Sequence, residues 1–209
     1  MKRIIALFLG IVMIAMITGC SSQTNYELSK TYDSISLSSE IPVVYDDGSF
    51  MVNVDNPEEI VGWGDYVFVA KVEAELRTEY TNLRENENGT ITGKPYTVYS
   101  ITVIDNLKGK LKKNEPIEFF KHGGVNYDGK SISLLEGDQL LEVGKYYILV
   151  AAAEADGRLG QGMPHSAIEL DATSKQEVVS NEEYKNFKKY IKNEVKLERD
   201  RFTSVYEEE

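Results

Sequence analysis

The residue best suited to covalent chemistry in this sequence is Cys20, the only cysteine among 209 residues. It closes the tetrapeptide ITGC at positions 17–20, directly after an apolar run. A thiolate alkylates more readily than other side chains. One cysteine cannot form an internal disulfide, and His122 and His165 are too few for a histidine-based zinc cluster.

The segment before Cys20 has the pattern of a secretory signal peptide. Lys2 and Arg3 form a short positive region, and residues 4–17 are uncharged and apolar. About 16 residues separate Arg3 from Cys20, fewer than the roughly 20 that a membrane-spanning helix needs. The order of an aliphatic residue, a small residue, glycine and cysteine at positions 17–20 resembles the lipobox of bacterial lipoprotein precursors.

This resemblance implies that residues 1–19 are a signal peptide, cleaved between Gly19 and Cys20. It also implies a diacylglyceryl thioether on the Cys20 sulfur, which would hold the chain at the membrane, facing the extracytoplasmic side. Paired acyl chains anchor a protein more stably than one chain. The alternative is an uncleaved signal anchor in which Cys20 has no role. Residues 20–50 begin with a Ser- and Thr-rich stretch, which predicts a lipid-anchored flexible tether.

Residues 51–178 predict a mainly β domain. Polar and apolar residues alternate over 66–76, residues 96–103 are rich in β-branched and aromatic types, and 145–153 form a nearly continuous apolar run. Gly-containing turns separate these segments, and helices do not alternate with them. We therefore expect a small antiparallel OB-like barrel of five to six strands. The order of segments over roughly 55–155 is similar to small OB-like extracytoplasmic domains of bacterial lipoproteins.

Helices are expected on both sides of the barrel segments. Asn56 and Pro57 begin a short helix as N-cap and first helical residue. An amphipathic helix is predicted over 179–201, where Ser180 and Glu183 form a capping box. Its apolar positions are Tyr184, Phe187, Ile191 and Val195, and beside them runs a cationic stripe of Lys185, Lys189, Lys192 and Lys196. These lysines are either solvated and paired with glutamates or in contact with anionic lipid or wall polymer. Residues 202–209 are expected to be a frayed acidic tail.

Few motifs in the sequence point to catalysis. It lacks a G-x-S-x-G elbow, an H-E-x-x-H helix, a P-loop and a G-x-G-x-x-G loop. The tripeptide His122-Gly123-Gly124 matches part of a hydrolase oxyanion motif, and its structural interpretation is a strand end followed by a tight turn. No cofactor or metal is predicted. The net charge of −11 disfavours nucleic acid as a partner.

The remaining indication of function is the large number of aromatic residues. Barrels of this kind can present aromatic rings to sugars or extended peptides, and the alternative is that the rings straddle core and solvent with only the hydroxyl exposed. The chain has 13 tyrosines, including Tyr96, Tyr99, Tyr127, Tyr146 and Tyr147. We therefore expect a non-enzymatic binding module for a protein or envelope polymer. Two alternatives stay open. One is an envelope hydrolase built from scattered carboxylates, and the other is an immunity or shield lipoprotein that acts against a toxin or protease.

Overall fold

The computed structural model describes residues 41–208, so the predicted signal peptide and the lipidation of Cys20 lie outside the described residues. The predicted mainly β fold is confirmed. The strands are β1 (Val43–Asp46), β2 (Tyr66–Glu85), β3 (Ile91–Lys108), β4 (Pro116–His122), β5 (Gly124–Val125), β6 (Ile132–Leu135), β7 (Tyr146–Ala153), β8 (Leu159–Gln161) and β9 (Ala167–Leu170). The helices are α1 (Pro57–Trp63), α2 (Lys175–Ser180) and α3 (Glu182–Lys192).

Five strands close into an OB-like barrel. The six-stranded sheet has the order β2-β3-β4-β8-β7-β9, and β7 pairs with β2 as well, which joins the two ends of the row β2-β3-β4-β8-β7. Closure is strong at β2 and β7, where Tyr66–Lys71 pair with Tyr146–Ala151. It is weak at the parallel junction of β4 and β8, which has two residue pairs, Phe120 with Gly160 and Lys121 with Gln161. The predicted strand count is therefore confirmed, and the ring includes one parallel pair among antiparallel ones.

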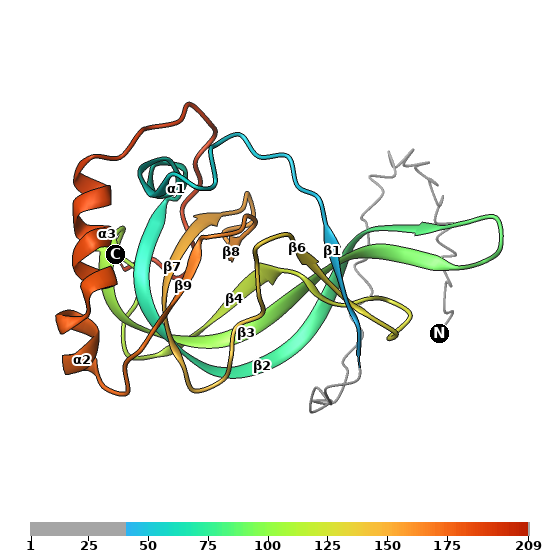
Figure 1. The fold of residues 1–209 in the computed structure, drawn as a ribbon, viewed down its shortest axis with the longest axis horizontal. Coiled ribbons are helices and arrows are strands. Elements are labelled where there is room, and N and C mark those ends of the chain that lie inside the picture. The colour runs from blue at the N-terminus through green and yellow to red at the C-terminus, as the bar shows by residue number, and fades with distance from the viewer. Residues whose placement is uncertain (1–40, 209) are drawn as a thin grey trace, which may run out of the picture.

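Strand β2 is buried on both faces where it forms the barrel wall. Phe68, Ala70 and Val72 point into the barrel core, as the alternating pattern predicts. Val67 and Val69, on the opposite face, belong to a second apolar cluster that also includes residues of α1 and α3. Since helices cover the outer face, the strand is not half-buried as the sequence pattern suggested. Figure 1 shows α1 and α3 at the same end of the barrel.

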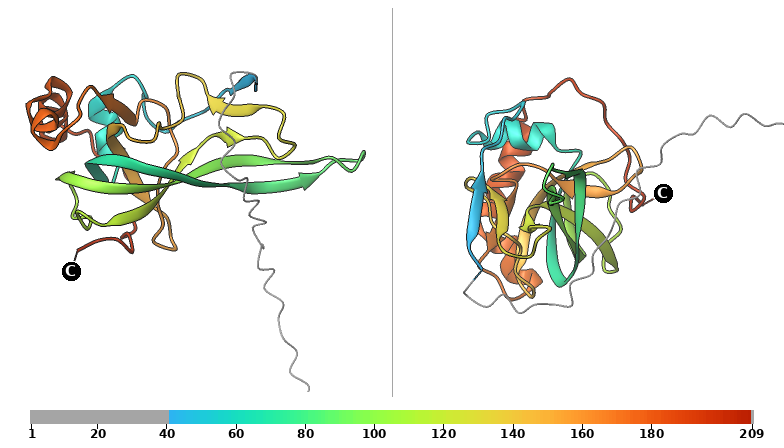
Figure 2. Two further views of the ribbon diagram at one scale, coloured as in Figure 1. Left: turned by 90° about the horizontal axis from the view of Figure 1, so that it is seen from below. Right: turned by 90° about the vertical axis from the view of Figure 1, so that its right-hand side faces the viewer.

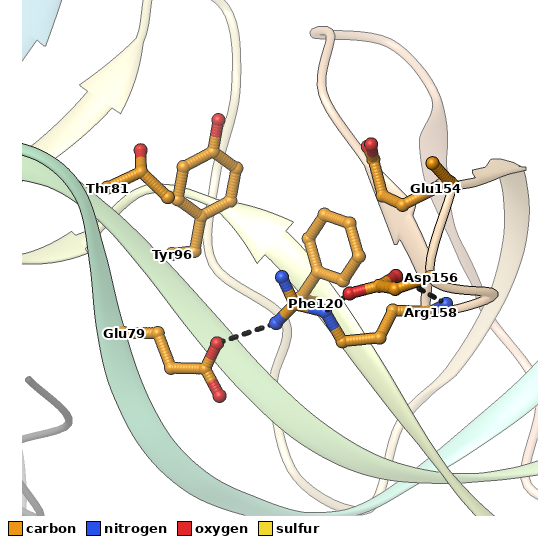
Figure 3. A pocket seen from close by; sticks show the side chains of 8 residues that line it. Glu79, Thr81, Tyr96, Phe120, Glu154, Asp156 and Arg158 are labelled. Carbon is orange, nitrogen blue, oxygen red and sulfur yellow. Dashed lines mark hydrogen bonds and ion pairs between the residues drawn. The ribbon is translucent and has the colours of Figure 1, made fainter. Parts of the chain in front are cut away.

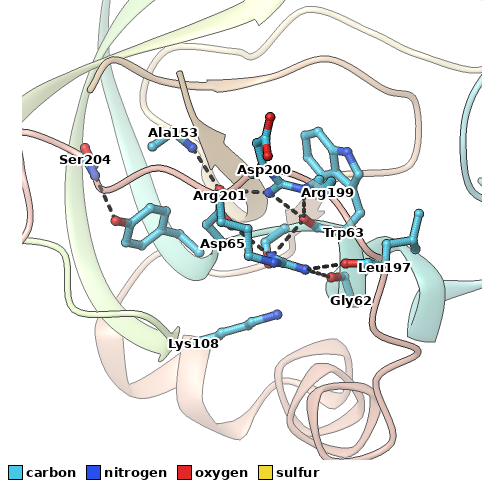
Figure 4. Close-up of polar contacts among 12 residues, drawn as sticks. Gly62, Trp63, Asp65, Lys108, Ala153, Leu197, Arg199, Asp200, Arg201 and Ser204 are labelled. Carbon is cyan, nitrogen blue, oxygen red and sulfur yellow. Dashed lines mark hydrogen bonds and ion pairs between the residues drawn. The ribbon is translucent and has the colours of Figure 1, made fainter. Parts of the chain in front are cut away.

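Helix α1 begins as predicted and ends in a contact that the sequence did not indicate. The Asn56 side chain accepts a hydrogen bond from the backbone N–H of Glu58, and Pro57 is the first helical residue. At the other end, Arg199 donates to the Trp63 carbonyl at 2.7 and 3.0 Å, and Arg201 donates to the Gly62 carbonyl at 2.7 Å. Figure 4 shows both guanidinium groups at this helix end. Cations stabilise the exposed carbonyls at a helix C-terminus.

The C-terminal region differs from the predicted single helix over 179–201. Ser180 ends α2, and Asn181 is the N-cap of α3, with its side chain accepting from the Glu183 N–H. Helix α3 stops at Lys192, so Val195 and Lys196 are outside it. The Val195 N–H donates instead to the Glu58 carbonyl at 3.0 Å, because the chain turns back along α1.

The expected tether and acidic tail both contribute to the fold. Strand β1, within the predicted tether of 20–50, pairs in parallel with β6. In the predicted tail, Glu207 forms a bridge with Leu111, and its carboxylate accepts from the Tyr66 hydroxyl at 2.5 Å. Burial and this bond raise the pKa of Tyr66 to about 12. Local sequence could not predict either pairing, because the partners lie far away along the chain.

The β2–β3 hairpin extends well beyond the barrel. The polar stretch 83–95 is mostly strand, with a short turn at Asn86–Thr90 in which Gly89 has φ +76°. Figure 2 shows the hairpin projecting at the end opposite to the helices. The small sheet β1-β6-β5 lies near the base of this projection, as Figure 1 also shows. Because the hairpin projects from the barrel, its residues can line pockets on two of its surfaces.

We predict that Asp138→Asn destabilises the fold. Lys121 is fully buried at the weak β4–β8 junction, and its ammonium pairs with Asp138 at 2.5 Å. Burial lowers the pKa of Lys121, and the Asp138 carboxylate opposes this shift. Removing one partner of a buried pair costs about 3–5 kcal/mol. Urea unfolding at neutral pH measures this loss.

The matched control for that prediction replaces both partners with apolar residues, as Lys121→Met with Asp138→Leu. The double variant is expected to recover most of the lost free energy of unfolding, because neither buried charge remains. Equal stability of Asp138→Asn and wild type would show that the pair does not hold the junction.

Candidate functional site

A pocket on the barrel wall lies between β2, β3, β4 and the loop that joins β7 to β8. Its volume is about 370 Å³, within the range of small-ligand sites. Figure 3 shows side chains from all of these elements facing one another. In OB-like barrels this strand face and the adjoining loops are a frequent ligand surface. The lining residues are Glu79, Thr81, Tyr96, Phe120, Glu154, Ala155, Asp156 and Arg158.

A row of aromatic rings crosses the wall of this pocket. Tyr96 on β3 packs edge-on against Phe120 on β4, with ring centroids 5.9 Å apart. On its other side the Tyr96 ring packs against His122, at 5.1 Å. Tyr96 therefore contacts both other rings of the row, and its side chain is half-buried. Tyr99 and Tyr147, in contrast, lie in the barrel core.

One arginine organises the charges in the pocket. Arg158 pairs with Glu79 at 2.8 Å and with Asp156 at 2.9 Å, and its guanidinium lies 5.3 Å from the Phe120 ring centroid. Hydrogen bonds from Arg158 lower the pKa of Asp156. The Glu154 side chain has no hydrogen bond or ion pair with any residue in 41–208. Burial, and then the Glu154 charge, raise the pKa of Tyr96.

These groups are suited to binding a ring or an extended chain that carries hydrogen-bond donors. The aromatic row offers stacking surface, and the exposed Glu154 carboxylate remains available at the rim. Acid catalysis is less favoured, because a general acid needs a raised pKa and Asp156 has a lowered one. Within residues 41–208, no group of three or more His, Cys, Asp or Glu side chains could hold a metal ion.

His122 ends a strand as the structural interpretation predicts, but the expected tight turn at Gly123 and Gly124 is wrong. Gly123 and Gly124 have φ values of +102° and +152°, and a Cβ on Gly124 would lie 2.6 Å from the Thr97 hydroxyl. His122 ends β4, Gly123 forms a parallel bridge with Tyr96, and Gly124 begins β5, while a bond from the Thr97 hydroxyl to the Gly123 carbonyl anchors the segment. His122 is 9 % exposed, and its Nδ1 has no hydrogen-bond partner in the described chain. It lines a second pocket, separate from the first.

The structure brings together three of the four lysines of the predicted cationic stripe. Lys185, Lys189 and Lys192 are exposed on α3, whereas Lys196 follows the helix and lines a different pocket. None of the four forms an ion pair with the described residues, so the expected pairing with glutamates is not seen there. In residues 41–208, no helix is both long and apolar enough to cross a membrane.

Sequence reasoning missed most of the charged residues in the pocket. Glu79 and Arg158 are 79 positions apart, and they meet only because the β7–β8 loop closes over β2. The one available signal was the sequence Ala-Asp-Gly at 155–157, which marks a turn but not its location.

Comparison with known proteins found no family whose sequence model matches this chain, and no curated protein similar to it. The site is therefore defined by its geometry.

We predict that His122 makes the fold sensitive to mild acid. Burial, followed by the charges of Lys121 and Lys94, lowers the pKa of His122 below its ordinary 6.5, while Asp138 and Asp46 act in the opposite direction. The unfolded chain then binds a proton first, so stability present above pH 6.5 is lost as pH falls toward the lower folded pKa. Urea unfolding at several pH values between 7 and 5 measures this loss.

His122→Gln should flatten the pH dependence over that interval, because glutamine does not titrate. His165→Gln removes the exposed histidine and is the matched control. An unchanged pH dependence in His122→Gln would assign the acid sensitivity to other groups.

Proposed function

We propose that this protein is an extracytoplasmic lipoprotein, held at the membrane through Cys20, that binds an extended envelope polymer or protein segment without turning it over. The observation that carries the binding proposal is the pocket beside Tyr96. It combines an aromatic wall, a fixed arginine network and a carboxylate at the rim. The lipobox at 17–20 and the apolar run before it support the membrane location.

Electrostatics favour a ligand with donor groups or positive charge. Three carboxylates and one arginine line the pocket, and Arg158 already pairs with Glu79 and Asp156. Glu154 is then the acceptor left for a ligand. A protein of net charge −11 also repels polyanions over longer distances, so nucleic acid remains a disfavoured partner.

Binding is preferred to hydrolysis for a specific reason. Two-carboxylate hydrolysis needs one protonated acid and one ionised group on either side of the bond that breaks. Here Arg158 pairs with two of the three carboxylates, and its hydrogen bonds lower the pKa of one of them, Asp156. Turnover of an envelope polymer by the purified chain, lost in Glu154→Gln, would reverse this preference.

We predict that Tyr96→Ala weakens binding to the envelope ligand roughly tenfold, because the ring supplies the central stacking surface. The measurement is cosedimentation of the full chain, in mild detergent, with insoluble cell-wall polymer, alongside crosslinking to envelope proteins on intact cells.

Tyr96→Phe is the matched variant, since it keeps the ring and loses only the hydroxyl. Retained binding in Tyr96→Phe with loss in Tyr96→Ala would support stacking. Equal binding by Tyr96→Ala and wild type, with polymer and protein alike, would place the functional surface elsewhere.

The anchoring proposal has a separate test. Cys20→Ala is expected to leave a longer, unlipidated precursor, because no other thiol can receive the diacylglyceryl group. Intact mass of the chain extracted from membranes measures cleavage and lipid together. Ser21→Ala is the control, and a Cys20→Ala chain with wild-type mass and membrane partitioning would contradict lipidation.

A further inference from the structure

A second pocket lies between the base of the β2–β3 hairpin and the small sheet β1-β6-β5. Its volume is about 580 Å³, larger than that of the pocket beside Tyr96. Four charged side chains line it: Asp46, Asp47, Arg84 and Lys94. His122 and Ser133 contribute a buried imidazole and a buried hydroxyl.

The charges of this pocket are balanced but unpaired. Asp46 and Asp47 come from β1 and the residue after it, whereas Arg84 and Lys94 come from the two strands of the hairpin. None of the four side chains forms an ion pair or hydrogen bond with any residue in the described part of the chain. Elsewhere in the fold, in contrast, arginines such as Arg158 and Arg201 are paired.

The pocket has two negative and two positive side chains, and this arrangement disfavours ligands that carry charge of only one sign. A polyanion would be attracted by Arg84 and Lys94 but repelled by the two aspartates, and a polycation would meet the reverse arrangement. A ligand that carries both an ammonium and a carboxylate can satisfy all four groups. Capture of peptide termini is a known form of recognition, and arginine binds carboxylates through two parallel hydrogen bonds.

A neutral hydrogen-bonding wall completes the site. Burial keeps the pKa of His122 low, so its imidazole is neutral near pH 7. Asn82, which also lines the pocket, has φ +52° at the irregular pairing between Thr81 and Arg84. Such a positive φ in a residue other than glycine is uncommon and is held by its surroundings.

We propose that this second pocket binds a small zwitterion, an amino acid or short peptide. Asp46 and Asp47 hold its ammonium group, and Arg84 and Lys94 hold its carboxylate. The proposal does not depend on the function proposed for the pocket beside Tyr96. Because all four charged side chains are exposed, each contact is partly screened and binding is expected in the millimolar range.

The test is a titration of the full, isotopically labelled chain, in mild detergent, with diglycine, followed by NMR. Diglycine is expected to cause saturable shifts at Asp46, Lys94 and His122. N-acetyl-diglycine and diglycine amide, which each lack one charge, should bind roughly fivefold more weakly. Absence of saturable shifts up to about 50 mM, or equal binding of all three probes, would overturn the proposal.

Paired variants assign each charge to its partner. In Asp46→Asn with Asp47→Asn, acetylation of the probe should no longer weaken binding. In Arg84→Gln with Lys94→Gln, amidation should no longer matter. Lys113→Gln with Asp171→Asn changes exposed charges outside the pocket and should behave as wild type. Failure of this pattern, with Tyr96-dependent polymer binding intact, would remove only the zwitterion site.

Discussion

Closure of the barrel through β7 is the constraint on which the rest of the structure depends. One edge of this strand pairs with β2 over six residues, and its other edge pairs with β9 and then with β8. Every residue from Tyr147 to Ala153 is buried, which explains why the run is apolar without alternation. Closure also fixes where the β7–β8 loop lies. Arg158 therefore reaches Glu79 on β2, and the first pocket exists because the ring closes.

Local signals in the sequence predicted the elements that depend on local physics. Asn56 and Pro57 marked the start of α1, and the inward face of β2 followed from its alternation. The outward face was predicted incorrectly, because Val67 and Val69 pack in one cluster with residues of α1, which directly precedes the strand, and of α3, which lies far away in sequence. The mainly β class and the five- to six-strand barrel needed only the spacing of strands and turns.

Pairings between distant segments could not be predicted in the same way. Strand β1 pairs with β6 across nearly half of the chain, and its residues are exposed, so it has no amphipathic pattern to reveal it. The end of α3 was missed because the apolar spacing continues to Val195 after the helix has stopped. For the pockets, Tyr96 was identifiable as an aromatic candidate. The charges around it required the three-dimensional fold.

The barrel is joined weakly on both sides of β8, which has two residue pairs with β4 and two with β7. Two residue pairs join β4 to β8, so few backbone hydrogen bonds hold the junction. Beside the junction, Lys121 of β4 pairs with Asp138 of the β6–β7 loop, and the Gln161 amide of β8 donates to the Met163 carbonyl. The Gln161 Oε1 atom and the His122 Nδ1 atom nevertheless remain without partners in the described chain. Buried polar atoms of this kind cost stability, and they are uncommon unless function or strain retains them.

Because the His122 ring also packs against Tyr96, the buried polar groups near the β4–β8 junction and the aromatic row form one continuous wall between the pockets. The long pairing of β2 with β7 stabilises the closed barrel. Strand β4, which contributes less to closure, can therefore carry polar groups between the two candidate binding surfaces.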